Sequence, residues 1–439
     1  MPGPGSLWDR LGFSQNPYFT TPIEVSDDGR HLFVGRSQEI RRLIAKWDEP
    51  NGAITVVGGN IGTGKTSFLN VCQYLSLMGI RDFQLTYDPP YLMPSYSKVQ
   101  LETGQEDQDL LLRVLRAAAE SIKRACSVIG EPVPDAVEEV LQWLDSLTGS
   151  STSTTGGGLS GGVAGYSTGI SFSRSQGAGA RASGDISRDS LVAALSRLAA
   201  AVRTVREYRG IIVAINNIEM VDTTQVVELL NRFRDTLFAV EGVWWVLIGQ
   251  RGLYDLIEAE APRVAQRIKG TETTLDGLSW EDFHLAIQAR AEQFRTRPDA
   301  VAPVGDALLR ALFDASNGEI RYVFKMADDI VTDALAANPG STNVPPAMAE
   351  SMLRDAVQSQ LDRLALTERQ RRVLRLMTEQ RGVRPMQYKD YGFQNAPHFI
   401  QTLHPLQEKG LVSKSTQGNV ALYTPRSMVI LAHSFGMLG

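Results

Sequence analysis

A glycine-rich segment, Gly59-Asn-Ile-Gly-Thr-Gly-Lys-Thr66, constrains the fold of this chain more than any other part of it. It follows a short β-branched run at 54–57 and precedes a stretch with helical periodicity that ends near residue 77. The spacing G-x-x-x-x-G-K-[ST] lets backbone N–H groups curl around phosphate oxygens, while the following helix directs the positive end of its dipole at them. We therefore expect a phosphate-binding loop (a P-loop) between a buried strand and a helix.

The chemistry of this loop predicts binding of ATP with Mg²⁺. The Lys65 ammonium is expected to contact the β- and γ-phosphates, and the Thr66 hydroxyl is expected to be a ligand of the metal. The residues expected to surround the phosphates are Gly59, Asn60, Ile61, Gly62, Thr63, Gly64, Lys65, Thr66 and Ser67.

Strand and helix patterns alternate over residues 53–278, which predicts an α/β fold with a parallel sheet. The expected strands lie at 54–57, 83–87, 211–215, 243–248 and 273–275. The full length of 439 residues allows two or three domains. We expect an entry segment at 1–52, the α/β core at 53–278, a helical region at 279–360 and a terminal unit at 361–439.

Residues 149–185 interrupt the alternating pattern. Gly, Ser and Thr dominate this stretch, so it cannot bury enough apolar surface to offset the entropy of ordering. We predict a flexible insertion here. A second interpretation stays open: the apolar and polar residues alternate over 166–173, which fits a hairpin that orders on oligomerisation or on a partner.

The apolar strand at 211–215 is followed by Asn216-Asn217-Ile-Glu219. P-loop ATPases commonly have an acidic residue here that holds Mg²⁺, and often a base for the attacking water. An amide orients water, but it accepts no proton and neutralises no charge on the metal. Glu219 could substitute in part. The sequence therefore predicts nucleotide binding and leaves open whether the chain is an ATPase.

The terminal unit, 361–439, has the element order typical of a winged helix-turn-helix. Thr367 begins one helix as its N-cap, a short second helix is expected at Met386–Tyr391, and Asn395 caps a third helix that contains Pro405. Two strands joined through Gln417-Gly-Asn then form the expected wing.

The same unit carries most of the positive charge of the chain. It has 11 Lys and Arg against 5 Asp and Glu, a net of +6, whereas the rest of the chain has a net of −11. Since neutralisation of phosphates drives nucleic-acid binding, we predict contact with DNA. The candidate contacts are Arg369, Arg371, Arg372, Arg384, His398, Gln401 and Lys414. The alternative is a winged helix that docks a protein, because the third helix has few cations.

Together these segments resemble AAA+ ATPases of the origin-recognition and cell-division-cycle initiator type and the related signal-transduction ATPases with numerous domains, over roughly residues 11–335. Phe33-Val-Gly-Arg36 is similar to the turn that holds adenine in that family, which places Val34 and Gly35 at the base. Asn16-Pro-Tyr18 resembles the entry motif of transposition-type relatives. The resemblance implies a parallel-sheet P-loop AAA+ core with a helical lid and a C-terminal winged helix-turn-helix domain.

The resemblance also implies roles for single residues. Gln250, after the strand at 243–248, corresponds to a polar sensor of the nucleotide. Arg267, favoured over Arg263, resembles the arginine finger presented to a neighbouring subunit. Arg321, in Gly318-Glu-Ile-Arg, resembles the lid's sensor arginine. With Asn216, Asn217 and Glu219 these residues form the expected catalytic set of a homo-oligomer.

The leading hypothesis is an ATP-dependent, DNA-associated switch. The alternative is a signalling scaffold in which ATP is a structural ligand and the winged helix binds protein. The two cysteines, Cys72 and Cys126, are too few for a disulfide framework. No run approaches the ~18 apolar residues that a membrane span needs, and the N-terminus is no secretory signal. We therefore expect a cytoplasmic protein without a membrane partner.

Overall fold

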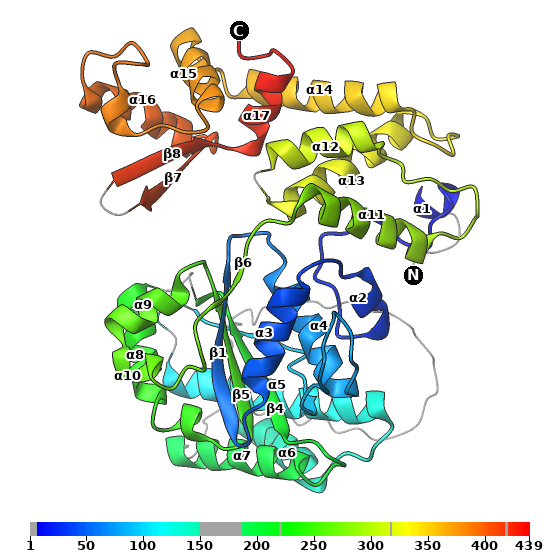
Figure 1. Cartoon of the computed structure of the whole chain (residues 1–439), viewed down its shortest axis with the longest axis vertical. Coiled ribbons are helices and arrows are strands. Elements are labelled where there is room, and N and C mark those ends of the chain that lie inside the picture. Colours follow the sequence, from blue (N-terminus) through cyan, green and yellow to red (C-terminus); the bar gives the residue numbers. More distant parts are fainter. Residues whose placement is uncertain are drawn as a thin grey trace. The chain divides into compact units, whose positions relative to one another are not determined.

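The computed structural model describes residues 7–102, 104, 106–148, 187–218, 222–316, 318–417 and 420–439. The chain divides into two compact units. We call Pro22–Asp276 the sheet unit, and Gly277–Gly439 together with the residues up to Thr21 the helical unit (Figure 1). The expected insertion at 149–185 lies outside the described residues. None of the described helices is long and apolar enough to cross a membrane.

A parallel sheet forms the centre of the sheet unit. Its strands are β1 (Gly52–Gly59), β2 (Leu92–Met93), β3 (Val99–Gln100), β4 (Gly210–Asn216), β5 (Val243–Gly249) and β6 (Thr273–Leu275). The order is β2-β4-β5-β1-β6, with β3 also paired to β4, and every pairing is parallel. The predicted α/β class is confirmed, and the carboxyl ends of the strands lie along one edge.

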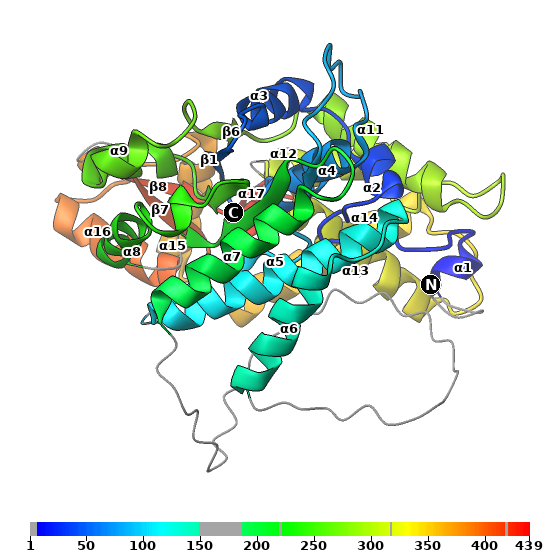
Figure 2. The ribbon, with the colours of Figure 1, turned by 90° about the horizontal axis from the view of Figure 1, so that it is seen from below.

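Helices cover both faces of this sheet (Figure 2). Trp47 of α3 donates to the Thr55 hydroxyl at 3.4 Å, so α3 and the neighbouring α4 lie on the face opposite to Ile54 and Val56. Strands buried on two faces consist of continuous apolar runs, which explains the pattern of β4 and β5. The helices are α2 (Asp27–Leu32), α3 (Ser37–Trp47), α4 (Lys65–Met78), α5 (Asp107–Ile129), α6 (Asp135–Thr148), α7 (Arg188–Val202), α8 (Thr223–Phe233), α9 (Leu253–Glu260) and α10 (Pro262–Ala265).

The strand predicted at Phe83–Tyr87 is wrong. This segment forms turns, and Phe83 and Gln84 have positive φ values of 49° and 60°, which an extended strand does not allow. The Phe83 ring packs edge-on against Phe33 at 6.2 Å, so its apolar character reflects packing on the entry segment. The strands after α4 are instead the short β2 and β3, which are defined by their pairing with β4.

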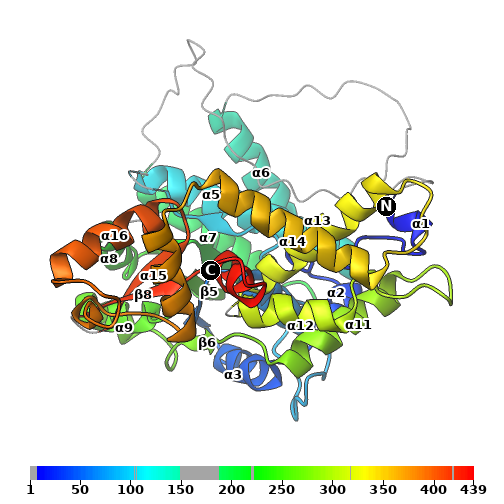
Figure 3. The same cartoon turned by 90° about the horizontal axis from the view of Figure 1, so that it is seen from above.

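The helical unit begins with helices that pack on one another through apolar faces. They are α1 (Leu7–Arg10), α11 (Trp280–Phe294), α12 (Asp306–Ala315), α13 (Ile320–Ala337) and α14 (Pro346–Arg363). Figure 3 shows α14 beside α12 and α13, with which it is in contact. Gly277 and Gly318 approach so closely that a Cβ on Gly318 would lie 3.1 Å from the Gly277 Cα.

Asn16-Pro-Tyr18 packs within the helical unit. Tyr18 is fully buried. The Arg290 guanidinium, on α11, lies 4.1 Å from the ring centroids of both Phe19 and Phe324 and donates to the Phe19 carbonyl at 3.0 Å. Burial among these groups lowers the pKa of Arg290 to about 9. A buried cation held by two rings and a carbonyl therefore attaches the start of the chain to this unit.

The C-terminal elements follow in the predicted order. α15 (Glu368–Glu379) begins at Thr367, which forms a capping box with Gln370, and α16 (Ala396–Glu408) is capped by the Asn395 side chain. β7 (Val412–Gln417) and β8 (Val420–Pro425) then pair as an antiparallel hairpin. Pro405 lies inside α16, as expected.

Two features of this region differ from the prediction. The helix expected at Met386–Tyr391 is only a 3-10 turn, η3 (Pro385–Gln387), followed by hydrogen-bonded turns that end at Gly392, whose φ is 76°. A terminal helix, α17 (Ser427–Ser434), was not predicted. It packs on α12, α14 and α15 through an apolar sequence with little amphipathic periodicity, so nothing in its local pattern marks it as a surface helix.

A polar network connects α4 to the segment before β3. The Asn70 side chain, one turn after the expected P-loop, donates to the Ile23 carbonyl at 2.6 Å and accepts a hydrogen bond from the Lys98 ammonium. Lys98 also donates to the Tyr96 carbonyl at 3.5 Å. Burial, with a smaller effect of the Arg124 charge, lowers the pKa of Lys98 to about 7.

This pKa predicts a pH-dependent stability. Because the folded state disfavours the charged Lys98, the unfolded chain binds more protons between about pH 7 and pH 10, and stability rises with pH across this window. Lys98→Met should remove this dependence and raise the free energy of unfolding near neutral pH by about 2 kcal/mol. This is less than the full shift implies, because the substitution also removes the hydrogen bonds of the ammonium to Asn70 and Tyr96. Urea unfolding at a series of pH values measures both effects.

Lys123→Met is the matched control. Lys123 is exposed and pairs with Glu138 at 2.7 Å, so its substitution should leave the pH dependence of the native chain unchanged. Equal pH slopes for the native chain and Lys98→Met would contradict the assignment.

Candidate nucleotide site and nucleic-acid interface

The segment 59–66 has the local structure that its sequence predicts. β1 ends at Gly59 and α4 begins at Lys65, and Gly62 and Gly64 between them have φ values of 82° and 84°. A Cβ on Gly59 would lie 2.7 Å from the Leu275 carbonyl oxygen, so the loop leaves the sheet through a space that only glycine fits. The loop thus joins a central parallel strand to the start of a buried helix.

The loop is held by its own polar groups. The Lys65 ammonium donates to the carbonyls of Gly59 at 2.7 Å and Asn60 at 3.1 Å, and the Thr63 hydroxyl donates to the Asn60 carbonyl at 3.0 Å. Thr66 is half-buried in the first turn of α4, whereas Ile61 is 62% exposed at the tip of the loop. The Thr63 N–H also donates to the Asn60 carbonyl, at 3.4 Å, so both backbone and side-chain hydrogen bonds close the turn.

Ser67 has a role that the motif does not indicate. Its hydroxyl accepts the Ile23 N–H at 3.1 Å and so fixes the segment before α2 to the first turn of α4. The expectation that Ser67 lies beside the phosphates stays a prediction, and its hydrogen bond to Ile23 is an additional contact.

Arg36 links the loop to the end of the sheet unit. Its buried guanidinium donates to the carbonyls of Thr63, at 3.4 Å, and Asp276, and lies 3.5 Å from the Glu39 carboxylate. Val34 and Gly35, the expected adenine contacts, are half-buried just before it. Arg36 was part of the recognised turn but was absent from our candidate residues, since its contacts are distant in sequence.

The amides that replace the expected acids lie at the end of β4, Asn216 as its last residue and Asn217 directly after it, on the same edge of the sheet. Asn216 and Asn217 are half-buried, and Asn217 has a φ of 58°, a left-handed conformation that Asn tolerates better than most residues. β5 separates β4 from β1, and Gln250 is exposed directly after β5. Parallel pairing therefore brings these three residues to the edge that carries the P-loop. Glu219 lies outside the described residues.

Arg267 is held at the C-terminal end of α8. It donates to the Arg234 carbonyl at 2.6 Å and to the Asp235 carboxylate at 3.0 Å. Arg263, on α10, is exposed. The neighbouring Arg234 hydrogen bond keeps the pKa of Asp235 below its usual value. Arg321 is exposed in the first turn of α13, in the helical unit.

The C-terminal cations form no ion pairs within the described part of 361–439, although five acidic residues occur in this region. Several have other contacts: Arg371 donates to the Met437 carbonyl at 3.1 Å, the Arg369 guanidinium lies 4.3 Å from the Phe393 ring, and Lys414 lies 5.8 Å from the Tyr423 ring. Arg371 thereby supports the end of the chain. The exposed candidates are Arg369, Arg372, Arg384, His398, Gln401 and Lys414.

His398 and Gln401 lie on the outer face of α16, because Phe399, Leu403 and Leu406 bury the opposite face. This is the arrangement that a helix needs to present polar groups to base edges.

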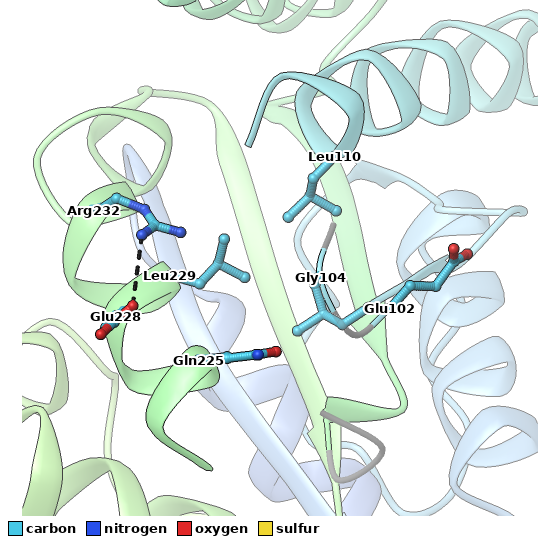
Figure 4. Close-up of a pocket in the computed structure, with 8 residues that line it drawn as sticks. Glu102, Gly104, Leu110, Gln225, Glu228, Leu229 and Arg232 are labelled. Atoms are coloured by element: carbon cyan, nitrogen blue, oxygen red, sulfur yellow. Dashed lines mark ion pairs between the residues drawn. The ribbon is translucent and has the colours of Figure 1, made fainter. Parts of the chain in front are cut away.

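A small pocket lies elsewhere in the sheet unit, between the start of α5 and α8 (Figure 4). Its volume is about 90 Å³, and Leu110 and Leu229 contribute apolar surface. Arg232 at its rim pairs with Asp107 at 2.8 Å and with Glu228 at 3.9 Å. No residue of the P-loop lines it, so it is separate from the candidate nucleotide site.

No protein-family model and no curated protein matches this chain. Several solved structures are similar to it in fold. The Aeropyrum pernix ORC1 protein in complex with DNA is 16% identical, over 95% of this chain and 96% of that chain, with a TM-score of 0.43. The ADP form of the Aeropyrum pernix ORC2 protein is 14% identical, over 97% and 98% of the two chains, with a TM-score of 0.44. CDC6P from Pyrobaculum aerophilum is 13% identical over the same shares, with a TM-score of 0.43.

These are proteins of the kind that the sequence motifs resemble. At such identities and TM-scores the likeness concerns the fold, and the function of this chain has to be inferred from its own residues.

Proposed function

We propose that this chain is a nucleotide-operated switch that binds Mg²⁺·ATP at residues 59–66 and engages DNA through its C-terminal winged helix. The observation that carries the proposal is the strand–loop–helix geometry of the P-loop, with Gly62 and Gly64 in left-handed conformations and Lys65 at the start of α4. N–H groups at a helix N-terminus and a lysine beside them are a suitable site for a triphosphate. In this site Thr66 would hold the magnesium ion, which neutralises part of the phosphate charge.

Hydrolysis is expected to be slow in the proposed switch. Asn216 and Asn217 at the end of β4 can orient water, but they supply neither a negative charge for the metal nor a base. ATP would then act mainly through its residence time, in a cytoplasmic protein.

We further propose that ATP promotes self-association and that Arg263 is the arginine presented to a neighbouring copy. The sequence favoured Arg267, whose guanidinium is engaged at the end of α8 by Arg234 and Asp235. A guanidinium that is hydrogen-bonded to a helix end of its own subunit has less freedom to reach a nucleotide phosphate bound to a neighbouring subunit. Arg263 is exposed one helical turn earlier, on α10.

DNA is the partner that the C-terminal charge favours. Cations that have no carboxylate partner among the described residues can neutralise DNA phosphates. The counterions condensed on the DNA are then released, and this release drives binding. In this arrangement Arg369, Arg372, Arg384 and Lys414 hold phosphates, and α16 presents His398 and Gln401 to base edges.

Nucleotide binding is tested by titrating the full chain with Mg²⁺·ATP in a calorimeter. Lys65→Ala should weaken binding by about 100-fold, because it removes charge-assisted hydrogen bonds to the phosphates. Absence of a binding heat in the native chain, or equal affinity in Lys65→Ala, would contradict the proposed site. Phosphate release by the same two proteins should differ little, as expected from the two amides.

Self-association is tested by sedimentation velocity with and without Mg²⁺·ATP. Arg263→Ala should suppress the ATP-dependent increase in size and leave the unfolding temperature unchanged. Arg267→Ala should lower the unfolding temperature by about 2–4 °C, because a capping cation at the end of α8 is lost. If only Arg267→Ala abolishes the ATP-dependent assembly, Arg267 is the arginine presented to the neighbouring copy. If the native chain sediments at the same size with and without Mg²⁺·ATP, the proposed self-association is contradicted.

DNA binding is tested by fluorescence anisotropy of a labelled duplex over a range of salt concentrations. Arg372→Ala and Lys414→Ala should each weaken binding by the full chain and lower the slope of log affinity against log salt by about 1. Arg310→Ala is the matched control, since Arg310 pairs with Asp314 at 3.0 Å. If the native chain fails to bind at low salt, the winged helix docks a protein instead, as in a signalling scaffold.

A further inference from the structure

Glu272 occupies a place behind the P-loop that no sequence motif marks. It directly precedes β6, and its carboxylate accepts the Gly252 N–H and the Tyr254 N–H, each at 3.3 Å, and the Thr274 hydroxyl at 3.0 Å. Gly252 is the N-cap of α9, and Tyr254 lies in the first turn of this helix, which follows Gln250. One side chain thereby connects the start of β6 to the turn that leaves β5.

The same carboxylate lies against β1. A Cβ built on Gly58 would be 2.1 Å from Glu272 Oε1 and 2.5 Å from Oε2, so the absence of a side chain at Gly58 makes room for it. Gly58 is the residue directly before the P-loop. Glu272 therefore contacts the exits of two neighbouring strands, one leading to the phosphate loop and the other to Gln250.

α9 depends on this distant group for its N-terminal cap. Its own N-cap is Gly252, which has no side chain to offer. N–H groups in the first turn need acceptors, and a carboxylate also interacts favourably with the positive end of the helix. A local Ser, Thr, Asp or Asn would satisfy the helix equally well. A cap supplied by Glu272, directly before β6 and in contact with Gly58, has a further effect, because it fixes the position of the turn at 250–252 relative to β1.

We propose that Glu272 is a positioning residue that holds Gln250 in register with the P-loop, so that the site distinguishes ATP from ADP. This inference rests on the proposed nucleotide function. Glu272 does not touch the nucleotide in this arrangement. It acts by preventing the turn at 250–252 from moving away from the strand that supplies the phosphate loop.

The test is the ratio of the affinities of the full chain for Mg²⁺·ATP and Mg²⁺·ADP, measured by calorimetry. Gln250→Ala should lower the native preference for ATP by about 10-fold, since it removes a hydrogen bond to a charged group. Glu272→Ala should also lower the preference for ATP, by about 5-fold. The double variant should show the same preference as Gln250→Ala, because the effects of residues that act through one another are not additive.

Two further substitutions distinguish positioning from simple loss of a helix cap. Glu272→Gln keeps one acceptor oxygen for the Gly252 N–H and the Thr274 hydroxyl, and it replaces the oxygen that accepts the Tyr254 N–H with an amide nitrogen. It should therefore lower the preference for ATP less than Glu272→Ala does. Gly58→Ala keeps the carboxylate but forces it to move, and should lower the preference for ATP as Glu272→Ala does.

Ser187→Ala is the matched control in the same unit. The Ser187 hydroxyl caps α7 by accepting the Ser190 N–H at 3.1 Å, so its loss should affect stability without changing the ratio. An unchanged ratio in Glu272→Ala and Gly58→Ala, additive effects in the double variant, or a native chain that does not discriminate would overturn the inference. In each of these cases a Lys65-dependent binding of ATP would leave the proposed function standing, whereas a native chain that binds neither nucleotide would overturn that function itself.

Discussion

The candidate site depends on the backbone of residues 59–66, which forms a turn at Asn60–Thr63 and is held by side chains from within the loop and from the entry segment. Its carbonyls are bonded by Lys65 at Gly59 and Asn60, and by Arg36 at Thr63. With its carbonyls held in this way, the loop ends at the N-terminus of α4, where the field of the helix favours an anion. Arg36 also bonds the Asp276 carbonyl, the last residue of the sheet unit, so the position of the loop is connected to the point where the chain leaves this unit.

The sequence predicted those parts of the fold that local chemistry determines. The loop, the strands at 211–215, 243–248 and 273–275, and the capped helices that begin after Thr367 and Asn395 were all predicted because each carries its own signal in neighbouring residues. β2 and β3 could not be predicted, because strands of two residues carry no pattern of their own and are defined only by their pairing with β4. Phe83–Tyr87 has the apolar composition of a strand, but its positive φ values place it in turns.

The candidate site shows the same division between local and distant signals. The P-loop motif located the loop between β1 and α4, and it could not show that Ser67 accepts the Ile23 N–H or that Glu272 caps a helix across β1. The sequence favours Arg267 over Arg263 only through a resemblance to a family motif. They differ because the carbonyl and carboxylate that engage Arg267 belong to residues 234 and 235, on another helix end. Contacts of this kind require the tertiary structure.

The proposed switch depends on discrimination between ATP and ADP, because the two amides at the end of β4 make hydrolysis slow. An enzyme with acidic residues at the positions of Asn216 and Asn217 could change its state quickly by hydrolysing ATP. Where hydrolysis is slow, the state of the protein follows from which nucleotide is bound and for how long, and therefore from the free-energy difference between the two complexes. That difference arises at the γ-phosphate, so groups that fix Gln250 relative to the P-loop would set it. A carboxylate held by three donors and seated in the space left by Gly58 is suited to that purpose, because it leaves the turn after β5 little room to relax.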